Sequence, residues 1–442
     1  MAQNEAPIIL DETEQKIINI IDSHRDQIID FAKDIYTHAE LGYTEHRTAG
    51  KVADWLQSCG MDVQTGLANT GVKASLGSAA PSVCLIGELD GIRSPEHPLA
   101  VPKTGMSHAC GHHMQLTALA GAALALSQPE VAAALTGRAV FFAVPCEEHV
   151  PMNRLEQLRS DGIATCCGGK PELLLRGAFD DIDAAITTHA HMVPCQSDFL
   201  LGCNSTSGFL SKLIHIKGRA SHTAIAPENG INALDVVTLA RSAIGMLRST
   251  FRDQDCIRIG EIVRMGDCAI NVVPHEVTVD LQVRAKTWDA LQTVNEQINR
   301  AYRGAAYAFG AEISIQDDMG YLPTIPAQPC KALTDAAKLL PATYEPVNPS
   351  VHNAASTDVG DLSHRMPIVN FTYGGFSGTL HGADFRITDK EKAYLYPAKL
   401  AALTMYHLLC DHAAQAQALL SDFHPAMTAE EYRAYAHKFG CQ

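Results

Sequence analysis

The sequence predicts an α/β protein with a larger domain, in which helices cover both faces of a mostly parallel sheet, and a smaller inserted α+β domain. Two observations support this prediction. Apolar runs of strand length alternate with helical patterns along most of the chain, which is typical of a parallel sheet covered by helices. Between about residues 204 and 316 the order becomes β-α-β-β-α-β, which indicates a separate split βαβ unit.

The elements of the larger domain are predicted from periodicity. Apolar residues recur at helical spacing between Ile17 and Phe31, and a second helix runs from Thr48 to Leu56 until Gly60 ends it. Four later apolar runs have strand length and are bounded by turn or polar residues: 82–90, 138–145, 183–190 and 367–375. We expect these runs to belong to the mostly parallel sheet.

The inserted unit has four predicted strands and two predicted helices. The strands cover residues 207–218, 257–265, 275–285 and 311–316, and the helices cover 231–249 and 288–309. A chain of 442 residues exceeds what one hydrophobic core usually supports, so two domains are expected. We predict residues 1–203 and 319–442 as the two parts of the larger domain, and 204–318 as the inserted domain.

Composition and charge exclude several classes of protein. Hydrophobic residues make up 46% of the chain and charged residues 19%, which excludes wholesale disorder, collagen and coiled coil. The net charge of −15 argues against a surface for nucleic acid or anionic membrane. The start of the chain lacks a secretory signal pattern, and the most apolar helical run, 117–126, has about half the length that spans a bilayer. The thirteen scattered cysteines are expected to be reduced thiols, so we expect a cytoplasmic protein.

The densest cluster of candidate metal ligands is SHACGHHM, in the loop that follows the predicted ELDGI strand. A thiolate and an imidazole two residues apart, Cys110 and His112, can face one metal ion from a loop that leaves a strand. The alternative is a buried thiol beside hydrogen-bonded histidines.

A second cluster, VPCEEH, places Glu147 and Glu148 at the end of the next predicted strand. One carboxylate can bind metal while its neighbour collects a proton from water.

Two further histidines follow predicted strands. His189 ends the strand 183–190, with His191 close behind it, and His381 lies in the Gly-rich loop after the strand 367–375. Either histidine alone is more often structural than a ligand. However, all four clusters fall where predicted strands end, and open α/β sheets bind ligands at the carboxyl edge of their strands. A metal site at this edge is therefore the better hypothesis.

The inserted domain contributes three candidates. His222 lies in a loop before a predicted helix, far in sequence from the other clusters, so a role in the same site needs domain closure or a partner chain. Asn271 and Arg284 are candidate anchors for a substrate carboxylate. For Arg284, surface ion pairing is the alternative.

Taken in order, these motifs resemble those of the aminoacylase/carboxypeptidase-type metal-dependent amidohydrolases, which include auxin-conjugate, hippurate and p-aminobenzoyl-glutamate hydrolases. The similarity runs nearly end to end, from HAELGYTEHRTAGKVADWL through GELDGI, HACGH, PCEE, GRASHTA and INVVP to GTLH. The segments STDVGDLS and GGKPELLLRGAFDDIDAA resemble most the p-aminobenzoyl-glutamate hydrolase branch.

The resemblance implies a role for each motif. It implies a catalytic α/β domain that carries an inserted lid and dimerisation domain, and one or two divalent ions per subunit. Thiolate and imidazole suit Zn²⁺, while carboxylates leave Mn²⁺ and Co²⁺ as candidates. Glu147 matches the general base, and His222 matches a lid histidine that helps to hold the developing oxyanion, often across a homodimer. The implied metal ligands are Cys110, His112, Glu148, His189 and His381.

The sequence also departs from the family pattern. His113 and Gln115 replace the usual acidic or amide residue and a further histidine, and His191 offers an alternative to His189. Cys146 stands where a small residue is common, His149 adds an imidazole, and the linker 150–170 is longer than in many relatives.

The main hypothesis is a metal-dependent hydrolase that cleaves an amide between an acyl or aryl group and an amino-acid-like moiety. The alternatives are a dipeptidase, a hydrolytic deaminase of an amino-substituted aromatic that uses the same site, and a metal-binding protein without catalysis. We expect a small-molecule substrate and a homodimer formed through the inserted domain.

Overall fold

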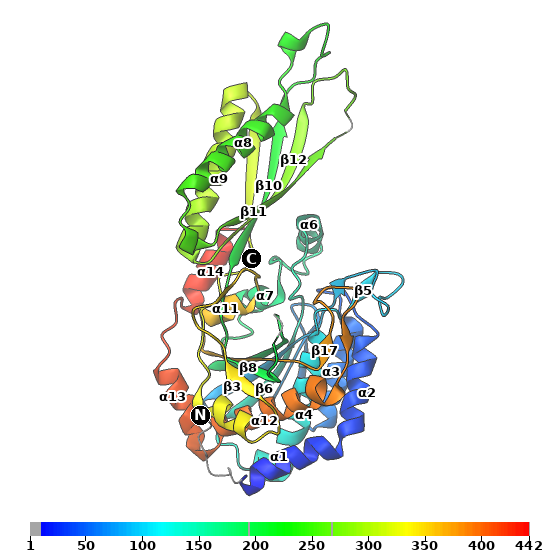
Figure 1. The fold of residues 1–442 in the computed structure, drawn as a ribbon, viewed down its shortest axis with the longest axis vertical. Coiled ribbons are helices and arrows are strands. Elements are labelled where there is room, and N and C mark those ends of the chain that lie inside the picture. Colours follow the sequence, from blue (N-terminus) through cyan, green and yellow to red (C-terminus); the bar gives the residue numbers. More distant parts are fainter. Residues whose placement is uncertain (1–9, 193–194, 267, 442) are drawn as a thin grey trace.

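The computed structural model describes residues 10–192, 195–266 and 268–441. It contains a larger α/β domain and an elongated inserted domain that rises from it (Figure 1). We call this inserted domain the lid. Among the helices of the described residues, none is long and apolar enough to cross a membrane. The predicted fold class is confirmed, with a large mixed sheet, helices on both of its faces and a separate lid.

The large sheet has eight strands in the order β1-β2-β6-β3-β7-β16-β8-β14. Its four central strands, β6, β3, β7 and β16, are parallel to one another. The parallel register places Leu85 opposite both Phe141 and Ile186. The strand bounds are β1 Val63–Leu67, β2 Gly71–Leu76, β3 Ser82–Glu88, β6 Arg138–Val144, β7 Ala184–Ala190, β8 Phe199–Leu201, β14 Tyr344–Pro346 and β16 Ile368–Tyr373. The four predicted core strands therefore all form.

Both faces of this sheet are buried. In β3, Val83 and Leu85 pack into one apolar cluster, while Cys84 and Ile86 pack into the other. This alternation follows from the two-residue period of a strand. The helices of the first face include α1 Glu12–Ser23, α2 Arg25–Tyr36, α3 His46–Ser58, α4 His112–Leu126, α10 Lys331–Lys338 and α12 Tyr396–Leu409. The helices of the second face are α6 Met152–Ser160, α7 Gly169–Leu175, α11 Val359–Ser363 and α14 Ala429–His437.

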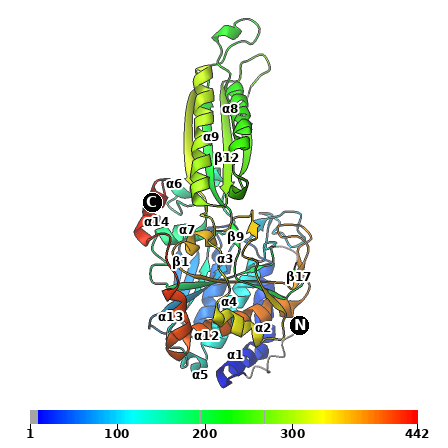
Figure 2. The same cartoon turned by 60° about the vertical axis from the view of Figure 1, so that its left-hand side comes forward.

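The lid follows the predicted order. Its four-stranded antiparallel sheet has the order β11-β12-β10-β13, and two helices pack on one face of that sheet (Figure 2). Its elements are β10 Gly208–Lys217, α8 Ala233–Leu247, β11 Arg258–Met265, β12 Glu276–Ala285, α9 Trp288–Phe309 and β13 Glu312–Met319. Val277, Val279, Leu281 and Val283 of β12 face the helices, so the residues between them lie on the open face.

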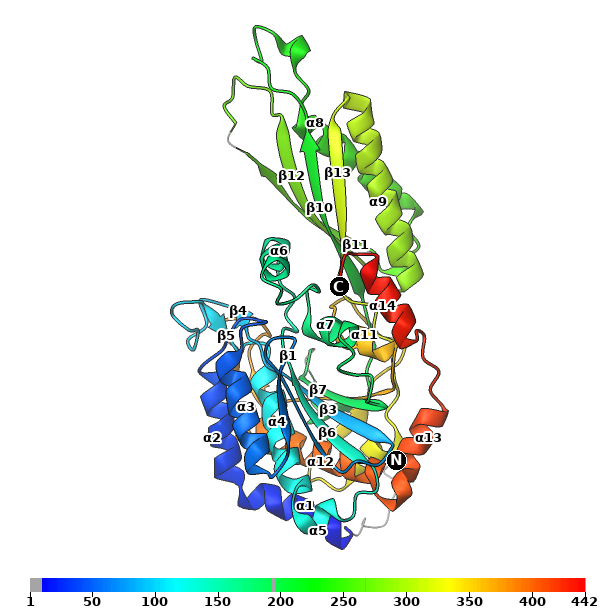
Figure 3. The same cartoon turned by 180° about the vertical axis from the view of Figure 1, so that it is seen from behind.

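The long segment between β6 and β7 contains helix α6, which lies between the larger domain and the lid (Figure 3). From the sequence, this segment is predicted only as a long linker. Arg159 of α6 forms an ion pair of 2.5 Å with Asp318 of β13, whose side chain is 1% exposed. The guanidinium also donates to the carbonyl of Thr165. Helix α6 is thus a contact between the two domains.

The fold predicts opposite effects for two helical glycines. A Cβ on Gly121 of α4 would lie 2.7 Å from Ala398 Cβ of α12, whereas a Cβ on Gly50 of α3 would meet nothing within 4 Å. We expect Gly121→Ala to destabilise the protein by about 1–3 kcal/mol, because two packed helices must separate. Gly50→Ala should stabilise it by up to about 1 kcal/mol through helix propensity. Urea unfolding of the full-length variants measures both effects, and a Gly121→Ala variant as stable as wild type would contradict the packing described.

Candidate metal centre

The candidate site lies where the central parallel strands end. Strand β3 ends at Glu88 and leads into Asp90, and β6 leads into Glu147 and Glu148. His189 is near the end of β7, and the loop after β16 carries the remaining histidine, His381. Because parallel strands share a carboxyl edge, residues up to 271 positions apart in sequence, such as Cys110 and His381, come into contact.

The turn before α4 depends on a glycine. Gly111 has φ of +89°, and a Cβ at this position would lie 3.1 Å from Ala190 Cβ. Glycine adopts this conformation without steric cost. The turn lets Cys110 and His112, the first residue of α4, approach the end of β7 from a buried position. His381 also has a positive φ, +68°, and its backbone N–H donates to Ala109 O at 2.9 Å.

The five predicted ligands converge. Cys110 Sγ is 3.5 Å from His189 Nε2 and 3.2 Å from His381 Nε2. His381 Nε2 is also 3.2 Å from Glu148 Oε1. Two groups of possible ligand atoms, each within 4.8 Å of one another, share the Cys110 thiol: Cys110, His112 and His189, and Cys110, Glu148 and His381. A shared thiolate suits two neighbouring ions.

The donor atoms fit a divalent metal ion. His112 Nδ1 lies 2.9 Å from Asp90 O, and His189 Nδ1 lies 2.8 Å from Ala190 O. A backbone carbonyl can only accept, so each Nδ1 carries hydrogen, and Nε2 is the atom that presents a lone pair to a metal ion once it carries no proton. His112 Nε2 and Glu148 Oε1 are buried and have no hydrogen-bond partner among the described residues. Thiolate, imidazole and carboxylate together form a donor set typical of zinc.

Glu147 lies beside the cluster as a candidate base. Its Oε2 is 3.8 Å from His112 Nε2, and its backbone carbonyl accepts a 2.6 Å hydrogen bond from the Tyr321 hydroxyl. Burial, followed by the charges of Glu88 and Glu148, raises the pKa of Glu147 well above its usual value. For Glu148 burial also acts to raise the pKa, but His381, whose Nε2 lies 3.2 Å from Glu148 Oε1, and the charge of His112 lower it to about 2. Of the two adjacent carboxyls, Glu147 therefore has the higher pKa and Glu148 the lower one.

A buried charge network that sequence analysis did not assign lies behind the cluster. Lys170 is completely buried and pairs with Glu88 at 2.6 Å and with Asp358. Gln115 Nε2 donates to Glu88 Oε2 at 2.7 Å, and Glu88 N donates to Gln115 Oε1 at 3.2 Å. The motifs GELDGI, GGKPELL and STDVGDLS that contain Glu88, Lys170 and Asp358 carried the family resemblance, but their contact is visible only in the fold.

The additional histidines of the motifs do not join the ligand groups found among the described residues. His191 uses both ring nitrogens, at 2.8 Å from Thr372 Oγ1 and 3.1 Å from Ser197 O. His113 is buried and stacks on Tyr36 with 4.2 Å between ring centroids. The His149 ring packs against the Phe209 ring at the base of the lid, with 5.2 Å between ring centroids and the planes tilted by 55°.

The candidate site residues of the lid lie at its two opposite ends. His222 lies in the segment between β10 and α8, which forms the far tip of the lid (Figure 1). The neighbouring loop before β12 carries Asn271, whose carbonyl accepts a 3.0 Å hydrogen bond from Thr223 N. His222 and Asn271 are both exposed. Arg284 lies at the opposite, hinge end, where its guanidinium is 5.7 Å from the centre of the Phe209 ring and 3.3 Å from Ser356 Oγ.

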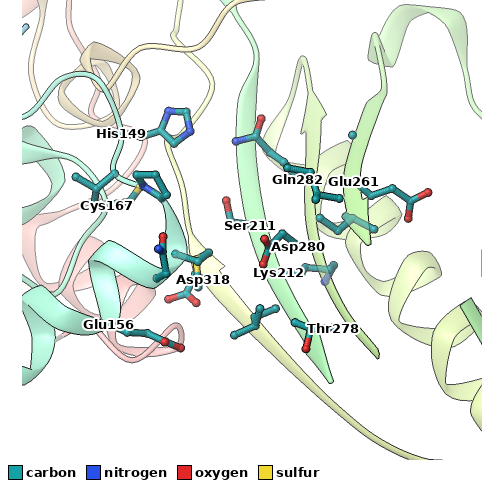
Figure 4. A pocket seen from close by; sticks show the side chains of 18 of the residues that line it. His149, Glu156, Cys167, Ser211, Lys212, Glu261, Thr278, Asp280, Gln282 and Asp318 are labelled. Carbon is teal, nitrogen blue, oxygen red and sulfur yellow. The ribbon is translucent and has the colours of Figure 1, made fainter. Parts of the chain in front are cut away.

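A cavity of about 740 Å³ lies between α6 and the lid strands (Figure 4). Its wall on the larger domain begins at His149, one residue after Glu148, and continues to Glu156 of α6. The lid contributes side chains from all four strands, including Ser211, Thr278 and Gln282. The five candidate ligands do not line this cavity, which adjoins the metal centre at His149.

Comparisons with known proteins agree with this architecture. Residues 84–406 match Peptidase family M20/M25/M40. The chain is 25% identical over 405 residues to the Xaa-Arg dipeptidase of Mus musculus, covering 87% of this chain and 86% of that protein. It is 25% identical over 320 residues to the N-acyl-L-amino acid amidohydrolase of Geobacillus stearothermophilus, covering 71% of this chain and 81% of that protein.

A solved structure shows the same fold. This is a dinuclear metal-binding peptidase of the M20 family from Bacillus subtilis, with a TM-score of 0.65 and 20% identity over 88% of this chain and 99% of that one. The family match covers far more than half of the chain. The protein therefore belongs to the peptidase M20/M25/M40 family, whose members are hydrolases that act on C–N bonds.

Proposed function

We propose that this protein is a metal-dependent amidohydrolase that cleaves the amide between an acyl or aryl group and an amino-acid-like moiety. The observation that supports this proposal most directly is the cluster of five ligand-type side chains around the Cys110 thiol, with the Glu147 carboxyl beside it. Both relatives named above carry names of enzymes that split such a bond.

We assign the metal ligands as Cys110, His112, Glu148, His189 and His381, with one or two divalent ions per subunit. The mixed donor set suits Zn²⁺, with Mn²⁺ and Co²⁺ as further candidates. A divalent ion held there would polarise the amide carbonyl and lower the pKa of a water molecule. Glu147 would take the proton of that water and return it to the departing nitrogen.

The open side of the cluster gives the direction of substrate approach. The His381 side chain is 50% exposed and that of Glu148 is 19% exposed, whereas the His112 side chain is fully buried. A substrate would enter on the side of His381. The cavity beside His149 is large enough to hold the part of the substrate beyond the amide, and Arg284 at the hinge is positioned to neutralise a carboxylate.

His222 would stabilise the oxyanion in the site of a partner subunit. Strand β10 has ten residues, so its two ends are about 30 Å apart at the rise of a strand. Phe209, at its base, contacts His149 beside the metal centre, while His222 follows its far end. Rotation of a rigid lid about its base therefore leaves His222 far from the site of its own chain. Asn271, beside His222 at the tip, would bind the same partner's substrate.

The lid surface supports a homodimer. Strand β11 is an edge strand of the lid sheet, and its Ile262 and Met265 are 56% and 48% exposed. Helix α8 exposes Leu239 and Met246, seven residues apart on one face. Edge pairing between two copies would bury these apolar side chains. We assign residues 204–318 to this lid and residues 1–203 and 319–442 to the catalytic domain.

All thirteen cysteines are free thiols, which supports the proposal of a reducing, cytoplasmic environment.

A dipeptidase is the second candidate activity, because one relative of similar length is a dipeptidase. No feature of the described site favours deamination over amide hydrolysis.

The ligand assignment predicts a loss of bound metal in two variants. Cys110→Ala and His381→Ala should each lower the metal content, because each removes a donor to the cluster. Cys84→Ala, at another buried cysteine, and His412→Ala, at another histidine with positive φ, are matched controls. Elemental analysis after dialysis measures the ratio of metal to protein. Full metal content in both site variants would contradict the assignment.

Glu147→Gln should retain metal but lose catalysis by about 100-fold or more, because the amide cannot accept the proton of water. The metal-loaded wild type and variant are incubated with N-acetyl, N-benzoyl and p-aminobenzoyl amino acids, dipeptides and aminobenzoates, and products are identified by mass spectrometry. We expect amide cleavage by wild type alone. Release of ammonia with gain of a ring hydroxyl would instead establish deamination, and equal rates for wild type and variant would contradict the role of Glu147.

Subunit mixing tests the location of His222. Inactive Glu147→Gln and His222→Ala dimers are unfolded together and refolded. Heterodimers then contain one site with Glu147 and a partner's His222, so about one quarter of wild-type activity should return. Replacing the first partner by the double variant Glu147→Gln, His222→Ala should abolish the rescue. If His222 acts within its own chain, the first mixture will stay inactive as well.

A further inference from the structure

The side chains behind His112 form a third group of possible ligand atoms. Atoms of Glu88, His112 and Glu147 lie within 4.8 Å of one another, and all three residues are buried. This group is at the closed end of the cluster, opposite the exposed His381. Glu88 is neither one of the five assigned ligands nor the base, although it lies closer to His112 than Glu147 does.

The contact between Glu88 and His112 requires a positive charge. Glu88 Oε2 is 3.1 Å from His112 Nε2, and this nitrogen has no hydrogen-bond partner among the described residues. Because Nδ1 donates to Asp90 O, Nε2 directs either a proton or its lone pair toward the carboxylate. Without a proton on Nε2, the two lone pairs repel one another unless a metal ion binds both.

The other contacts of Glu88 fix its orientation. Oε1 accepts from Lys170 Nζ at 2.6 Å, and Oε2 accepts from Gln115 Nε2 at 2.7 Å. Lys170 is held in turn by Asp358, which also accepts from its backbone N–H at 3.1 Å. Both carboxylates and the lysine are almost completely excluded from solvent. A charge network that is costly to bury keeps one carboxylate oxygen next to His112.

We propose that Glu88 is an additional ligand of the metal centre, and that Lys170 is the residue that positions it. The inference rests on the proposed metal-dependent function. Oε2 of Glu88 and Nε2 of His112 would bind the same ion, at the closed end of the site. Lys170 acts only through Glu88, because it occupies the other carboxylate oxygen and prevents the side chain from turning away.

Glu88 and Asp358 both pair with Lys170, so replacing each of them in turn provides a matched test of metal binding. Glu88→Gln and Asp358→Asn each remove one buried negative charge that pairs with Lys170, but only Glu88 touches His112. Affinity for Co²⁺ is measured by titration of the chelated full-length protein, and the visible Co²⁺ bands report the ligands. We expect Glu88→Gln to weaken the affinity by about 10- to 100-fold and to shift the bands. Asp358→Asn should retain both the wild-type affinity for Co²⁺ and the wild-type visible bands.

Lys170→Met should weaken Co²⁺ binding as Glu88→Gln does. The double variant Glu88→Gln, Lys170→Met should bind Co²⁺ no more weakly than either single variant. Lys212→Met is the control for loss of a buried lysine, since Lys212 is fully buried in the lid and pairs with Asp317. If Lys170→Met fails to fold, Glu88→Gln alone decides the proposal. Wild-type affinity and bands in Glu88→Gln, or equal changes in Asp358→Asn, would overturn it.

These results are separable from a failure of the proposed function. Wild-type protein that binds no metal and cleaves no amide would refute the function itself. Wild-type protein that binds metal and cleaves amides, with a Glu88→Gln variant that binds Co²⁺ as wild type does, would refute only the role of Glu88.

Discussion

The candidate site depends on the parallel alignment of β6, β3, β7 and β16, which brings the segments after all four strands to one edge of the sheet. The segment after β3 supplies Cys110 and His112, the segment after β6 supplies Glu148, and β7 and the loop after β16 supply one histidine each. Because both faces of these strands are packed against helices, their register cannot slip without exposing one apolar cluster or the other. The geometry of the donors is therefore maintained by the stability of the whole core, including α4, which begins at His112.

Charge burial is the second constraint. The closed end of the site places Glu88, Asp90 and Glu147 in a region with almost no solvent, and Lys170 is the buried ammonium that contacts this group. Burial acts to raise the pKa of Glu88, but the charge of Lys170, followed by those of His112 and His189, outweighs burial and lowers the pKa to about 2. Burial and the charges of Glu88 and Glu148 raise the pKa of Glu147. Glu88 is thus kept ionised while Glu147 is the more basic carboxyl, which is the difference that a base needs.

Much of this arrangement could be predicted from the sequence, for identifiable reasons. The order of strands and helices followed from local periodicity. The convergence of Cys110, Glu148, His189 and His381 followed because each lies at the end of a predicted strand or in the segment that follows one. The Lys170 network could not be found in this way. Its members are 82 and 188 residues apart, and only the packing of α7 and α11 on the sheet brings them together. A single buried lysine gives no periodic signal, and the Gly-Gly before Lys170 and the proline after it are typical of a surface turn. Likewise, no local pattern indicated that α6 would pair with the lid through Arg159.

The length of the lid makes the proposed catalytic site dependent on dimerisation. If the group that stabilises the oxyanion stands at the tip of a rigid sheet about 30 Å long, each site is incomplete until a second chain supplies it. The exposed apolar residues on β11 and α8 then affect catalysis without contacting a substrate, because the fraction of complete sites equals the fraction of dimers. Such a site also separates two tasks. Under this proposal the catalytic domain would hold the ions and the base, while the ion pair of Arg159 with Asp318 would restrain the lid relative to that domain.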